Sequence, residues 1–87
     1  MKFDDIYIAQ QDRFAIGIER DSGRYYLSIP VSNGMVEYEE YYEIDDSVFE
    51  RLNNAFAEVR NICELSRKRL NDNRLIEKPG KLRGSPV

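Results

Sequence analysis

Three consecutive segments of the chain alternate apolar and polar residues, and turn sequences separate them. The segments cover residues 14–19, 24–31 and 36–44. Alternation with a period of two is typical of strands that bury one face. Residues 20–23 and 32–34 have the composition of tight turns, and the second contains Asn-Gly, a strong hairpin signal. The sequence therefore predicts an antiparallel meander of at least three strands.

The apolar faces of the second hairpin restrict its register. Either a two-residue turn or a four-residue loop pairs Val31 with Val36 and keeps the apolar faces together. A slip by one residue would turn glutamates of the third segment into the core, at a high cost in free energy. Because Pro30 cannot donate a ladder hydrogen bond, we expect the pairing to break near it, which favours the longer loop or a bulge. This register places Tyr26 opposite Tyr41 on the outer face.

A further strand and one long helix complete the predicted α+β fold. Residues 3–9 fit an edge strand, although their two aspartates could equally begin a short helical turn. From Asp45 or Asp46 to about Leu70, apolar or small residues recur three and four positions apart, as on one face of a helix. The predicted stripe consists of Phe49, Leu52, Phe56, Val59, Cys63, Ser66 and Leu70.

We expect this long C-terminal helix to cover one face of an antiparallel meander sheet of three or four strands. The sheet needs a cover, and no other predicted helix could supply one. The same spacing also fits a coiled coil, so an overhanging part of the helix could join two copies as a homodimer. Residues 1–77 are predicted to form a single domain, and residues 78–87, rich in bases, proline and glycine, a mobile basic tail.

The composition favours a binding protein over an enzyme. The chain has no histidine, which removes the usual general base near neutral pH and the commonest metal ligand. Its single cysteine, Cys63, lies on the predicted helix stripe and is expected to be buried and inert. We therefore expect no catalytic residue, no metal and no cofactor. The chain also lacks a run of about eighteen apolar residues and a signal peptide, so we expect a cytoplasmic protein without a membrane partner.

Charge is distributed unevenly along the chain. Residues 1–50 hold twelve acids and four bases, whereas residues 51–87 hold four acids and nine bases. The basic half, including Arg67, Lys68 and Arg69, makes a nucleic-acid-binding or regulatory module an alternative. However, no helix-turn-helix, zinc or RNA-binding motif accompanies these bases, and cations are ordinary partners of a helix C-terminus. Nucleic acid is therefore not the expected partner.

The outer face of the third predicted strand is acidic and aromatic together, which suits a basic protein partner. The candidate partner-binding residues are Tyr26, Glu37, Glu39, Tyr41 and Glu43. Aromatic side chains supply buried anchor area, and carboxylates steer a basic surface. The alternative is a solvated face whose glutamates keep the sheet from aggregating. Glu40 is predicted to point inward, where it either pairs with a helix arginine such as Arg60 or sits at the edge of the sheet.

The two tyrosine-rich segments, residues 25–33 and 37–43, resemble small bacterial proteins of the type that gives immunity to toxins. The resemblance covers about a quarter of the chain and transfers no functional residue. It implies a small, acidic, non-enzymatic inhibitor that covers the active site of a basic toxin domain.

Overall fold

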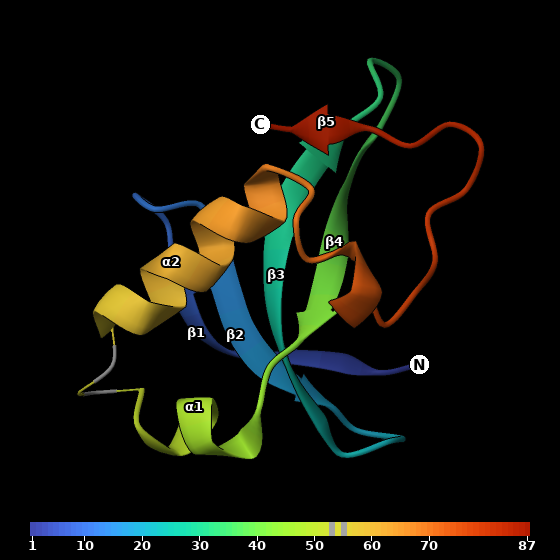
Figure 1. Cartoon of the computed structure of the whole chain (residues 1–87). Coiled ribbons are helices and arrows are strands. Elements are labelled where there is room, and N and C mark those ends of the chain that lie inside the picture. The colour runs from blue at the N-terminus through green and yellow to red at the C-terminus, as the bar shows by residue number, and fades with distance from the viewer. Residues whose placement is uncertain (53, 55) are drawn as a thin grey trace.

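A four-stranded antiparallel meander with helices against one face forms the fold, as the computed structural model in Figure 1 shows. The structure describes residues 1–52, 54 and 56–87. The strands are β1 (Phe3–Ala9), β2 (Phe14–Glu19), β3 (Arg24–Ser32), β4 (Glu37–Glu43) and β5 (Ser85–Pro86). The helices are α1 (Asp46–Glu50), α2 (Phe56–Arg67) and the short 3-10 helix η1 (Asp72–Arg74). The predicted α+β class is confirmed, and residues 3–9 form the edge strand.

The register of the second hairpin differs by two residues from the predicted one. Val31 pairs with Tyr38, and a four-residue loop follows Ser32. The Asn33 side-chain oxygen accepts backbone N–H groups from both Met35 and Val36, which stabilises this loop. A shift by two keeps the same faces inward, so only Val36 leaves the predicted core. The expected break at Pro30 is wrong, because the ladder to β4 runs through it.

One long helix is the part of the predicted fold that the structure corrects. Two separate helices, α1 and α2, occupy the predicted span, and Asn54 between them lies in a turn. The span also includes residues 53 and 55, which lie outside the described residues. Arg69 adopts a left-handed backbone conformation with φ of 64° and ends the second helix before Leu70. The homodimer through an overhanging helix therefore loses the element on which it depended.

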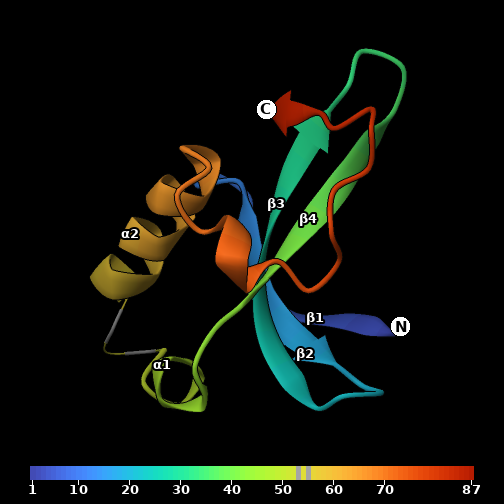
Figure 2. The ribbon, with the colours of Figure 1, turned by 45° about the vertical axis from the view of Figure 1, so that its right-hand side comes forward.

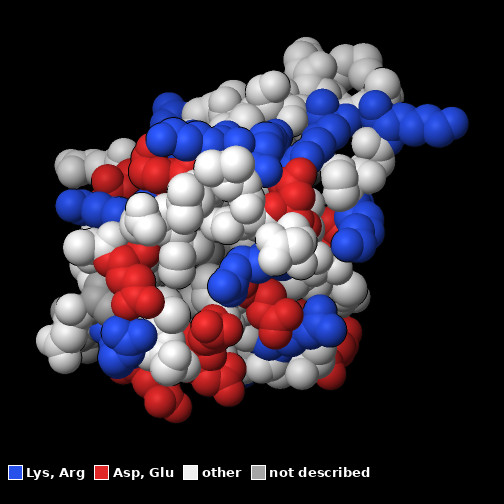
Figure 3. All heavy atoms as spheres, in the orientation of Figure 1, with Lys and Arg blue, Asp and Glu red and all other residues white. Residues whose placement is uncertain are grey.

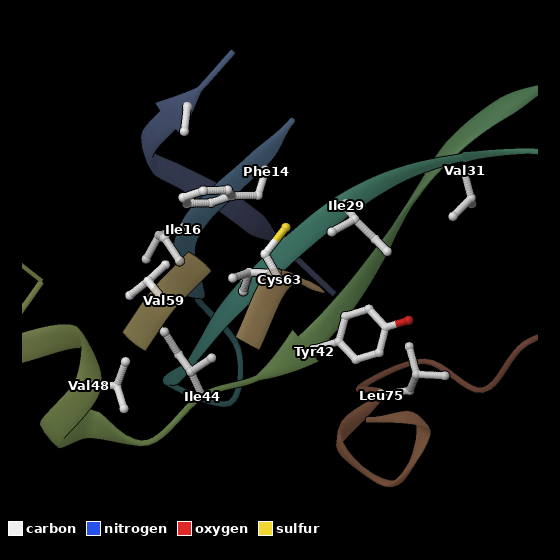
Figure 4. Packing of buried hydrophobic residues seen from close by; sticks show 12 residues of the cluster. Phe14, Ile16, Ile29, Val31, Tyr42, Ile44, Val48, Val59, Cys63 and Leu75 are labelled. Atoms are coloured by element: carbon white, nitrogen blue, oxygen red, sulfur yellow. The ribbon is translucent and has the colours of Figure 1, made fainter. Parts of the chain in front are cut away.

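The hydrophobic core lies between the sheet and the two helices, which pack on the same side of it (Figure 2). Figure 4 shows side chains of all of these elements converging there. Leu27 and Ile29 from the central strand β3 are fully buried, as predicted from the alternation. From α2, Val59 and Cys63 fill the same layer. Burial raises the pKa of the Cys63 thiol, which keeps it protonated and unreactive.

The carboxyl group of Glu40 is also buried on the core side of β4, where it pairs with two arginines. Arg83 Nε lies 2.8 Å from its Oε2, Arg69 forms a second ion pair, and the Tyr42 hydroxyl donates a hydrogen bond of 2.9 Å. Burial raises the pKa of Glu40, but these hydrogen bonds, that from Arg83 first, outweigh it and lower the pKa. The predicted partner Arg60 pairs instead with an aspartate of the β1–β2 turn. We call Glu40, Tyr42, Arg69, Asp72 and Arg83 the buried ionic network.

The tail that brings Arg83 to Glu40 lies against the sheet, and its predicted mobility stays a prediction. β5 pairs with β3 at Val31 and Ser32. It occupies the edge of β3 that β2 covers only as far as Ser28. The Gly84 N–H donates to the Tyr38 hydroxyl at 2.7 Å. Arg83 also forms an ion pair of 2.8 Å with Asp72 of η1. These contacts were missed because short polar tails carry no periodic signal.

Acid is expected to destabilise the fold through Glu19, which is buried at the end of β2. The Ser22 side chain, followed by the backbone N–H groups of Lys2 and Asp21, holds its pKa at about 2, below the ordinary 4.5. A carboxyl group with a lowered pKa contributes stability above its unfolded value and loses it as the pH falls. The urea concentration at the midpoint of unfolding should therefore decrease as the pH is lowered from about 4.5 to about 2. Glu19→Gln should flatten this part of the profile; an unchanged profile would contradict the assignment.

Candidate functional site

The outer face of the sheet, opposite α1 and α2, carries the predicted partner-binding residues. Glu37, Glu39 and Glu43 alternate along β4 and are exposed. Tyr41 lies between them and is half-buried. Tyr26, on β3, shares this face but is fully buried, so it cannot serve as an exposed anchor. Its neighbour across the ladder is Glu43 rather than Tyr41, because of the shifted register.

An aromatic cluster explains why Tyr26 is buried. β1 curls over the outer face, so that the Phe3 ring stacks on Tyr41 with centroids 3.6 Å apart. Phe3 also meets the Tyr26 ring edge-on at 5.4 Å. The contact joins the two outermost strands of the meander, β1 and β4, across the face. The outer face is therefore concave at this end and closed by aromatic rings.

Gly17 on β2 makes room for the buried tyrosine. It pairs with Tyr26 on β3, and the ring of Tyr26 covers the place of its missing side chain. The Tyr26 hydroxyl then donates a hydrogen bond of 2.5 Å to Asp5 on β1. Burial, with the hydrogen bond to Asp5, raises the pKa of Tyr26 far above its usual value. A strand glycine can introduce curvature into a sheet, and aromatic cover of a glycine helps to fix the register of the strands.

A trough of about 300 Å³ continues this concave face beyond the aromatic cluster. Asp5 and Ile8 line it from β1, and Glu39 lines it from β4. Ala15 of β2 and Pro30 of β3 form the floor of the trough, where their short side chains leave space above the sheet. Ala9, Gln10, Arg13 and Phe14 complete the lining. We call this feature the outer-face trough.

Glu39 is the carboxylate of the trough with the most perturbed environment. Partial burial raises its pKa, the Ser28 hydroxyl lowers it, and the negative charges of Asp5 and Glu37 raise it further. Its hydrogen bond in the described structure comes from Ser28, at 3.3 Å. No lysine or arginine among the described residues forms an ion pair with Asp5, Glu37 or Glu39. The wall of the trough thus holds negative charge that the fold itself does not neutralise.

Other outer and edge carboxylates do have partners. Asp4 forms an ion pair with Arg20 at 2.5 Å, and Glu43 lies 4.0 Å from Arg24. Both pairs are solvent-exposed and contribute little to stability. They reduce the negative charge at the aromatic end of the face. The unneutralised charge is therefore concentrated around the trough and the neighbouring Glu37.

The basic residues lie elsewhere, and several of them are used within the fold. Figure 3 shows lysines and arginines in a band over the C-terminal end of α2 and the tail. Arg67 donates two hydrogen bonds to the Val87 carbonyl oxygen, at 3.0 and 3.1 Å. Arg69 and Arg83 belong to the buried ionic network, and Arg74 bonds the backbone oxygen of Glu43. Most of the arginines that the nucleic-acid alternative would use are thus committed to internal contacts.

Neither a cluster of metal ligands nor a membrane-spanning helix occurs among the described residues. Within residues 1–52, 54 and 56–87, no three acidic or cysteine side chains converge as metal ligands. In the same part of the chain, no helix combines the length and the apolar character that crossing a bilayer requires.

Sequence reasoning found Glu39 and its neighbours but missed the opposite wall of the trough. Asp5 and Ile8 join the site because β1 curls, and a register shift between Asp5 and Tyr7 brings Ile8 opposite Ala15 on the outer face. A bulge of this kind has no clear signal in a single sequence. Comparisons with protein-family models, curated proteins and solved structures find no match for this chain.

Proposed function

We propose that the protein is a non-enzymatic binding domain whose acidic outer face binds a basic surface of another protein. The observation that carries the proposal is the unneutralised charge at Asp5, Glu37 and Glu39 on a concave face. Partial burial and like charges raise the pKa of Glu39, so its ionised form is disfavoured in the folded state. A carboxylate that costs folding free energy is better explained by a partner than by stability.

An immunity-type inhibitor is the specific form of this proposal. The resemblance of residues 25–33 and 37–43 to immunity proteins supports it, and a basic toxin domain would complement the acidic face. Electrostatic complementarity of this kind speeds association and excludes acidic competitors. Of the five predicted site residues, we retain Glu37, Glu39 and Glu43 as contacts and Tyr41 at the margin. Tyr26 is assigned to the support of the face.

Nucleic-acid binding by the basic helix end and tail is the weaker proposal. The arginines that would contact phosphates donate to internal acceptors instead. Lys68, Lys78 and Lys81 remain exposed, but no aromatic side chain accompanies them in sequence for stacking on bases. An exposed lysine cluster of this size is also ordinary for a solvated surface.

Charge reversal at Glu39 should test the proposed function. The candidate partner is a basic protein encoded beside this one, and binding to it would be measured by surface plasmon resonance at two salt concentrations. Glu39→Lys should slow association about tenfold or more at low salt, because it removes attraction and adds repulsion. The protein should remain folded, since the side chain is exposed.

Lys68→Glu on the segment that follows α2 is the matched control, and its association rate should change little. If Lys68→Glu abolishes binding while Glu39→Lys leaves it intact, the basic face is the binding site and the proposal is wrong. Tyr41→Ala is not a suitable probe, because its stacking on Phe3 also supports β1.

A further inference from the structure

We infer that the outer-face trough receives a single arginine side chain from a protruding loop of the protein partner. This inference rests on the proposed function and names the group that the site recognises. Residues of β1 and β4 form the two walls of the trough, and residues of the two intervening strands form its floor. A side chain could enter it more readily than a flat surface could.

The lining of the trough matches the two chemical parts of an arginine side chain. Ile8, Ala15 and Pro30 present apolar surface to an aliphatic stem. Ile8 is 60% exposed and Ile6 is 53% exposed, so apolar surface at this edge is still available for burial. Asp5 and Glu39 approach from opposite walls and present carboxylate oxygens to a cationic head. Apolar floor and acidic walls together distinguish the trough from an acidic surface patch.

Arginine fits the two walls better than lysine does. Its planar guanidinium has five N–H donors in a fixed geometry and can donate to two carboxylates at once. Burial and, to a smaller extent, the negative charge of Asp5 raise the pKa of Glu39. A cation between them would relieve that repulsion. The guanidinium of the partner would also give Glu39 the ion pair that it does not form within the described fold.

The protein's own Arg13 lines the trough but does not neutralise it. Arg13 lies in the turn after β1, with φ of 56°, and forms no ion pair within the described residues. Arg13 and Gln10, both in the β1–β2 turn, line the same end of the trough. A partner loop with an acidic residue next to its arginine would therefore be accommodated, whereas a second cation would be repelled.

The inference can be tested with short peptides and nuclear magnetic resonance. Acetyl-Gly-Arg-Gly-amide should shift the amide resonances of Ile8, Ala15 and Glu39. The matched peptide with citrulline, a neutral isostere of arginine, should bind about tenfold or more weakly, since it loses the charge-assisted hydrogen bonds. The lysine peptide should bind with intermediate affinity. Glu39→Gln should sharply reduce the difference between arginine and citrulline, while Glu64→Gln, at an exposed position of α2, should preserve it.

Two results would overturn the inference. One is equal binding of the arginine and citrulline peptides. The other is a set of shifts spread evenly over the exposed acids, including Asp46 and Glu50 of α1, which would indicate unspecific attraction. Either result leaves the proposed function standing if Glu39→Lys still slows association with the partner. Conversely, if the arginine peptide binds in the trough but Glu39→Lys does not change association with the partner, the proposed function alone is wrong.

Discussion

Removal of residues 78–87 is expected to destabilise the fold by about 3–5 kcal/mol, because it leaves a buried carboxylate short of a cation. The truncated chain loses Arg83 from Glu40 and Asp72, and β5 from the end of β3. This is a large share of the total stability of a small domain. The midpoint of urea denaturation, followed by circular dichroism, should fall sharply.

Single substitutions separate the contributions within the tail. Arg83→Ala should reproduce most of the loss, because the remaining ion pair with Arg69 leaves one Glu40 oxygen without its charged partner. Lys81→Ala, at an exposed position of the same segment, is the control and should change the midpoint little. A truncated chain that melts like the full chain would show that the tail is mobile, as its composition indicates.

Gly17→Ala is expected to destabilise the fold by about 3 kcal/mol through steric overlap. A Cβ at this position would meet the Tyr26 hydroxyl at 2.5 Å and would overlap the backbone oxygen of Asp4. Neither neighbour can move freely, since Tyr26 is fully buried and Asp4 lies in the β1 ladder. Thermal and urea unfolding would both measure the loss.

Gly80→Ala is the matched control, because a Cβ at that position would have no other atom within 4 Å. It should leave stability unchanged or raise it slightly. The Gly17 variant should also release β1, which amide hydrogen exchange would detect as lost protection in residues 3–9. Unchanged protection and stability would show that the aromatic cluster does not fix the curvature.

The sheet could be predicted from the sequence because its cause is local. Alternation in residues 14–19 and 24–31 identifies the strands and their core-facing side chains, although outer-face residues such as Ala15 and Tyr26 are buried too. Gly23 adopts the positive φ expected of a turn residue. The periodicity of the helical region was equally clear, but it did not reveal the interruption. Apolar spacing continues on both sides of the turn at Asn54, so the pattern could not show that two short helices share it.

The candidate site could be predicted only in part, for a different reason. The acidic residues of β4 were evident, but the face they occupy depends on contacts between distant segments. Phe3 covers Tyr41 from the other end of the meander and packs against Tyr26, so an aromatic face that looked exposed is partly closed. Such curvature follows from packing across the sheet rather than from the period of any one strand.

The buried ionic network has a consequence for the rates of folding and unfolding. Glu40 and Arg83 are 43 residues apart, whereas the β3–β4 hairpin joins residues that are close in sequence. Closing a long loop costs more entropy than forming a hairpin, so the local sheet contacts should precede the tail in folding. Interactions absent from the transition state slow unfolding without accelerating folding. The tail thus acts mainly on the lifetime of the folded protein, and it prolongs the time for which the acidic face remains intact.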